Sequence, residues 1–76
     1  MTLHAIIINK AIANNKDMAR QIAKHYFNDY LKNKTFVRET KNSFRVRVTP
    51  KTKFNYKTFK SHKVNKFITI VYGELK

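Results

Sequence analysis

The sequence contains no cysteine, only one glycine and one proline, and only four acidic residues. Without cysteine the chain forms no disulfide, and zinc sites built on cysteine are excluded. With so little glycine and proline, the eight asparagines are expected to occupy many of the turns. The scarcity of acidic residues has the largest consequence, because seventeen lysines and arginines then leave a net charge of +13.

Long hydrophobic runs are also missing. No stretch approaches the roughly 20 apolar residues of a membrane-spanning helix, and the start of the chain lacks the basic region and apolar core of a secretory signal. We therefore expect a cytoplasmic protein with no membrane partner. With 42% hydrophobic residues the chain is too apolar for a disordered basic tail. Residues 1–76 are expected to form a single domain, present as a monomer or weak dimer.

Hydrophobic periodicity predicts strands at both ends of the chain and a helix after the first strand. Residues 3–8 form a β-branched, apolar run that suits a central strand, although a helix running on to residue 13 is an alternative. From Asn14, the expected N-cap, pairs of apolar residues recur every four positions, which predicts an amphipathic helix ending near Asn33. Residues 67–72 form a second strongly apolar strand, which Gly73 ends.

Residues 35–40 and 43–49 are two strand-like runs separated by Lys41 and Asn42, which suggests a hairpin with a two-residue turn. This register places Arg38 directly opposite Arg45, an unfavourable pairing of like charges unless an anion lies between them. Guanidinium groups bind phosphate with two hydrogen bonds and stack on bases. The alternative is an ordinary solvated strand face. Four residues are predicted to gather on the face of the hairpin that points away from the core: Phe36, Arg38, Arg45 and Arg47.

Residues 51–66 lack a regular period and are expected to form a long loop, with one short strand or helical turn around Phe54–Phe59 as the alternative. Aromatic residues alternate here with lysines, a pattern that suits single-stranded nucleic acid. The favoured interpretation is that Phe54 and Phe59 anchor the segment to the core while the lysines contact phosphates. The candidate binding residues in this segment are Lys51, Lys53, Tyr56, Lys57, Lys60 and Lys63.

The expected fold class is α+β. One amphipathic helix packs on a mostly antiparallel sheet of four strands, or of five if residues 51–66 contribute one, in the order β-α-β-β-(β)-β. A single helix does not cover both faces of such a sheet. The second face is therefore expected to be largely open.

The basic residues concentrate in the second half of the chain. Residues 34–76 hold twelve lysines and arginines against two glutamates, a net charge of +10. A polyanion is the expected partner, and nucleic acid is the first choice because cations displace the counterions condensed on phosphates. The alternatives are charge that serves only solubility and a different acidic partner. Because no helix-turn-helix, zinc finger or RNA-recognition signature is present, we expect binding with little sequence specificity.

Groups suited to catalysis are sparse, so a non-catalytic protein without metal or cofactor is expected. The three histidines lack ligand spacing, and no nucleophile triad, phosphate loop or dinucleotide fingerprint is present. Two alternatives remain open. One is a small phage-type inhibitor, as the anti-CRISPR proteins are, that binds a nucleoprotein complex. The other is a small basic ribonuclease, because the layout resembles RelE-type messenger-RNA-cleaving toxins at the level of fold alone.

Overall fold

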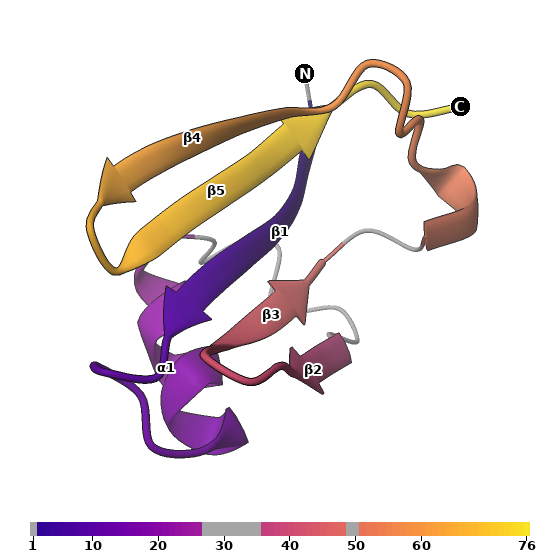
Figure 1. The fold of residues 1–76 in the computed structure, drawn as a ribbon. Coiled ribbons are helices and arrows are strands. Elements are labelled where there is room, and N and C mark those ends of the chain that lie inside the picture. The colour runs from indigo at the N-terminus through magenta and orange to yellow at the C-terminus, as the bar shows by residue number, and fades with distance from the viewer. Residues whose placement is uncertain (1, 27–35, 49–50) are drawn as a thin grey trace.

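The computed structural model describes residues 2–26, 36–48 and 51–76. Over these ranges the chain forms one α-helix packed on a five-stranded antiparallel sheet (Figure 1). The strands lie in the order β2 (Phe36–Glu39), β3 (Ser43–Arg47), β1 (Thr2–Asn9), β5 (Ile68–Gly73) and β4 (Lys60–Asn65). The strand β1 is therefore central, and β2 and β4 form the edges. This confirms the α+β prediction of a helix on a small antiparallel sheet. Within the described ranges, no helix has the length and apolar character needed to cross a membrane.

Strand β1 (Thr2–Asn9) pairs with β3 on one side and β5 on the other, as its apolar character on both faces predicts. Ile6 and Ile8 are fully buried and point toward the helix, where they join the hydrophobic core. Near the start of the strand, Leu3 faces Tyr72 and Ala5 faces Val71, so the register with β5 shifts by one residue. The residue at this bulge is His4.

Helix α1 (Lys16–Tyr26) packs against β1, β2 and β3, and buries Ala19 and Ala23. The predicted N-cap is wrong by one residue. The side chain of Asn15, not Asn14, accepts a hydrogen bond from the amide of Met18 at 2.9 Å. The predicted helical stretch beyond Tyr26, up to Asn33, lies outside the described residues.

Strands β2 (Phe36–Glu39) and β3 (Ser43–Arg47) form the predicted hairpin, and the predicted register is confirmed at every pair. The turn is closed by the side chains of Thr40 and Ser43, whose hydroxyl oxygens lie 2.7 Å apart. Phe44 and Val46 are buried toward the helix. The alternate residues of both strands therefore point to the other face of the sheet.

Residues 51–66 contain more structure than the sequence predicts. A 3₁₀ helix, η2 (Lys51–Lys53), starts the segment, and strand β4 (Lys60–Asn65) ends it by pairing with β5 (Ile68–Gly73). The expectation of a loop is wrong for residues 60–65, and β4 is the fifth strand that the sequence left open. Its residues are polar except for Val64, and all six are exposed, so burial imposes no alternation of apolar side chains. Backbone pairing with β5 defines this strand.

Candidate functional site

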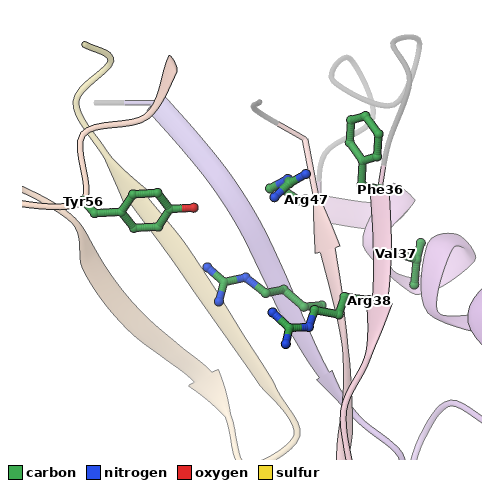
Figure 2. Close-up of a pocket in the computed structure, with 6 residues that line it drawn as sticks. Phe36, Val37, Arg38, Arg47 and Tyr56 are labelled. Atoms are coloured by element: carbon green, nitrogen blue, oxygen red, sulfur yellow. The ribbon is translucent and has the colours of Figure 1, made fainter. Parts of the chain in front are cut away.

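The hairpin places three arginines on the sheet face opposite α1. Arg38 of β2 lies directly across from Arg45 of β3, and Arg47 follows two residues later, where it pairs with Phe36. Together with the segment after η2, these residues border a pocket of about 290 Å³ that is open to solvent (Figure 2). We call this the arginine pocket, and it is lined by Phe36, Val37, Arg38, Arg45, Arg47 and Tyr56.

The arginine pocket has no acidic residue in its lining. Among the described residues, the two ion pairs lie elsewhere: Arg20 contacts Asp17 on α1, and Lys10 Nζ lies 2.7 Å from Glu39 Oε2. The hydrogen bond from Lys10 lowers the pKa of the Glu39 carboxyl. Glu39 pairs with the core residue Phe44, so it faces the helix side of the sheet. The positive charge of the pocket is therefore not neutralised by a neighbouring carboxylate.

Arg47 is the most constrained of the three arginines. Its guanidinium carbon lies 5.0 Å from the centre of the Phe36 ring, a cation–π distance. Its Nε atom is buried and has no hydrogen-bond partner among the described residues. A buried N–H without an acceptor costs roughly 1–3 kcal/mol. Within the described part of the chain, Arg47 thus holds an unsatisfied donor in a side chain that lines a positively charged pocket.

Tyr56 closes the pocket from the opposite side. Figure 2 shows its hydroxyl directed toward the arginine side chains, and Val37 directed away from them, toward the helix. The hydroxyl oxygen lies 2.9 Å from Nε2 of His4. Tyr56 keeps 37% of its surface exposed, so it reaches both the buried histidine and solvent.

His4 connects the pocket to the centre of the sheet. The bulge in β1 turns its side chain to the face of the arginines, because bulges redirect side chains at the position of the extra residue. The imidazole is fully buried and stacks on Phe54, with 4.0 Å between ring centroids and 11° between ring planes. Burial, followed by the charges of Arg45 and Arg47, lowers the pKa of His4 from 6.5 to about 4. His4 is therefore neutral at pH 7.

Phe54 anchors the segment that carries Tyr56, as the sequence predicts. Its ring is fully buried, and its Cζ would lie 2.8 Å from a Cβ at position 73, so the close approach requires Gly73. The backbone adds a short antiparallel contact, in which the amide of Asn55 donates to the carbonyl of Glu74 at 3.0 Å. The sheet face opposite the helix is thus less open than expected, because Phe54 and Tyr56 pack on it.

The remaining candidate residues lie outside the pocket. Phe59, the second expected anchor, is 52% exposed, so that expectation is wrong. By register with β5, Lys63 shares the face of the arginines and Lys60 lies on the opposite face. Lys53 and Lys57 are exposed, and the side chain of Lys51 lies outside the described part of the structure. The structure therefore brings together Phe36, Arg38, Arg45, Arg47 and Tyr56, but not the lysines.

Sequence reasoning missed His4, whose bond to Tyr56 joins positions 52 residues apart in the chain. The one available signal was a histidine inside an apolar strand, and that pattern indicates burial without indicating a function.

Among the described residues, no three histidine, aspartate or glutamate side chains lie close enough to hold a metal ion. Comparison with protein-family models, with curated proteins and with solved structures finds no match to this chain.

Proposed function

We propose that this protein binds nucleic acid in the cytoplasm, without catalysis, through the face that carries the arginine pocket. The observation that supports this proposal is the gathering of Arg38, Arg45 and Arg47 around one pocket with no carboxylate in its lining. Arg38 lies directly opposite Arg45, where Cβ atoms are about 5 Å apart, and like charges at such a position destabilise the hairpin. A polyphosphate offsets that repulsion and accepts two hydrogen bonds from each guanidinium group that binds it in bidentate geometry.

Binding is expected to depend little on sequence. The polar side chains in the pocket are three arginines and a tyrosine, with no asparagine or glutamine to read adenine, and guanidinium groups that are engaged on phosphates do not read guanine. Phe36 and Tyr56 remain 46% and 37% exposed and offer rings on which unpaired bases stack. The exposed lysines at positions 53, 57, 60 and 63 add long-range attraction to the phosphate backbone. We therefore expect single strands to bind more tightly than duplexes.

A pair of charge reversals tests whether this face, and not net charge alone, carries binding. The site variant is Arg38→Glu with Arg45→Glu. The control, Lys16→Glu with Lys24→Glu, makes the same change in net charge on exposed positions of α1. Affinity for a labelled single-stranded oligonucleotide is measured by fluorescence anisotropy between about 50 and about 200 mM salt.

The site variant should lose at least about tenfold in affinity. Its slope of log affinity against log salt should be shallower by about 0.7 for each phosphate contact removed. The control should lose much less. Equal losses in both variants would show that the protein responds to charge alone, and unchanged affinity in a folded site variant would overturn the proposal.

The same face also fits phosphates within a nucleoprotein complex, the target that an inhibitor of the anti-CRISPR kind would have. A pull-down from bacterial lysate with and without nuclease separates the two functions. Retention of one defined protein complex after nuclease treatment would indicate inhibition. Gel electrophoresis of RNA incubated with the protein tests the ribonuclease alternative, and intact RNA would exclude it.

A further inference from the structure

We propose that the arginine pocket seats one phosphate group of the bound strand, and that Tyr56 donates its hydroxyl hydrogen to that phosphate. This inference rests on the proposed function and names its central contact. The groups that line the pocket offer guanidinium donors and one hydroxyl, with no charged acceptor. A set of donors without a carboxylate matches an oxyanion, because phosphate oxygens accept several hydrogen bonds at once.

The direction of the bond between His4 and Tyr56 decides whether the hydroxyl hydrogen is free. Neutral imidazole carries one proton, on Nε2 or on Nδ1. Nε2 lies 2.9 Å from the Tyr56 oxygen, whereas Nδ1 is buried without a hydrogen-bond partner among the described residues. A proton on Nδ1 would leave a buried N–H unpaired, which is rarer than an unpaired acceptor.

The favoured tautomer therefore has the proton on Nε2, which donates to the Tyr56 oxygen. The hydroxyl hydrogen of Tyr56 is then not used by His4. Figure 2 shows that the hydroxyl lies on the side of Tyr56 that faces the arginines. His4 acts here as a positioning residue, since it orients a donor and does not itself touch the phosphate.

Arg47 gives an independent indication of a ligand. Its Nε donor is buried and lacks an acceptor among the described residues, in a side chain that lines the pocket. The cation–π contact with Phe36 limits how far the guanidinium can turn to find one. A phosphate in the pocket offers this side chain an acceptor that the described residues do not.

The size of the pocket favours a phosphate that remains attached to a nucleotide. A volume of about 290 Å³ equals the space of roughly ten water molecules in the liquid, more than a lone phosphate group fills. The additional room accommodates the sugar that carries the phosphate. The phosphate comes from one of two sources, the 5′ end of a strand or a phosphodiester within it.

The test compares Tyr56→Phe with Tyr26→Phe. Tyr56→Phe removes the hydroxyl but keeps the ring that contacts His4 and Phe54 edge-on, and Tyr26 is a partly exposed tyrosine of α1. Circular dichroism and the melting temperature confirm that both variants are folded. Each is titrated with a 5′-phosphorylated and a 5′-hydroxyl oligonucleotide of the same sequence, in phosphate-free buffer.

Tyr56→Phe should weaken binding by roughly tenfold, the loss expected for a hydrogen bond to a charged group, and Tyr26→Phe should not. Tighter binding of the 5′-phosphorylated strand by the parent assigns the pocket to a terminal phosphate, and equal binding assigns it to a phosphodiester. Unchanged affinity in Tyr56→Phe overturns this inference. If Arg38→Glu with Arg45→Glu still abolishes binding in that case, the proposed function stands without it.

The tautomer is measured separately. In ¹⁵N-labelled protein, NMR of the imidazole nitrogens should show His4 protonated on Nε2. A proton on Nδ1 would mean that Tyr56 donates to His4, and it would overturn the assigned role of the hydroxyl.

Discussion

The imidazole of His4 lies flat on the ring of Phe54, with 4.0 Å between the ring centroids. This contact joins the central strand of the sheet to the segment that carries Tyr56. Because His4 also bonds to the Tyr56 hydroxyl, a shift of Phe54 moves both ends of that bond. The geometry of the arginine pocket therefore depends on a packing contact outside the pocket.

Gly73→Ala tests this dependence. The added methyl group would approach Phe54 to within 2.8 Å, so the ring or the strand must move. Overpacking of this kind costs about 1–3 kcal/mol. We expect a lower melting temperature and weaker oligonucleotide binding, measured by thermal unfolding and anisotropy. Ser61→Ala on exposed strand β4 is the control. A Gly73→Ala variant with the melting temperature and the oligonucleotide affinity of the parent would contradict the proposed coupling.

Stability should fall in mildly acidic solution because of His4. Its pKa is about 4 in the folded protein against 6.5 for the free side chain. As the pH falls, the unfolded chain takes up this proton before the folded chain does. The His4 contribution is therefore fully present above about pH 6.5 and is lost between pH 6.5 and pH 4, by up to about 3 kcal/mol.

The measurement is the free energy of unfolding in urea at about pH 7 and at about pH 4.5, for the parent and for His4→Phe. The phenylalanine keeps a ring beside Phe54 but does not titrate, so the loss of stability between the two pH values should be smaller in this variant. His25→Gln on the exposed side of α1 should behave as the parent does. An equal acid loss in His4→Phe would assign the effect to the carboxylates.

Arg38 and Arg45 should reduce the stability of the free protein while they increase its affinity for phosphate. Arg38→Gln removes one of two facing positive charges, so in low salt without phosphate this variant should be as stable as the parent or more stable, by up to about 1 kcal/mol. Added oligonucleotide should raise the melting temperature of the parent more than that of the variant, because only ligand bound to the folded state stabilises it. A less stable Arg38→Gln in ligand-free buffer would show that no repulsion is present.

The hairpin was the most predictable part of this molecule. Alternation of Phe44, Val46 and Val48 with Arg45 and Arg47 determines which face is buried, and the two-residue turn then aligns both strands. These local features sufficed to place Arg38 opposite Arg45. Most of the arginine pocket was therefore predictable from sequence, since one face of one hairpin supplies four of its six residues.

The rest of the site depends on contacts between distant positions. Tyr56 meets His4 because β1 contains a bulge and because Gly73 leaves room for Phe54, and no periodic pattern encodes either feature. The position of strand β4 was not predictable for a different reason. Both of its faces are exposed, so its lysines and polar residues carry no hydrophobic period, and pairing with β5 alone makes it a strand.

The start of α1 gives a prediction that distinguishes two adjacent asparagines. The side-chain oxygen of Asn15 accepts the amide hydrogen of Met18, and its backbone carbonyl accepts that of Ala19 at 3.1 Å. Asn15→Ala should therefore lower the free energy of unfolding by about 1 kcal/mol, the usual loss for an N-cap side chain. Asn14→Ala, one residue earlier, should change it by less than about 0.5 kcal/mol. Urea unfolding of the two variants checks this difference, and a larger loss in Asn14→Ala would place the cap at the position that the sequence alone suggests.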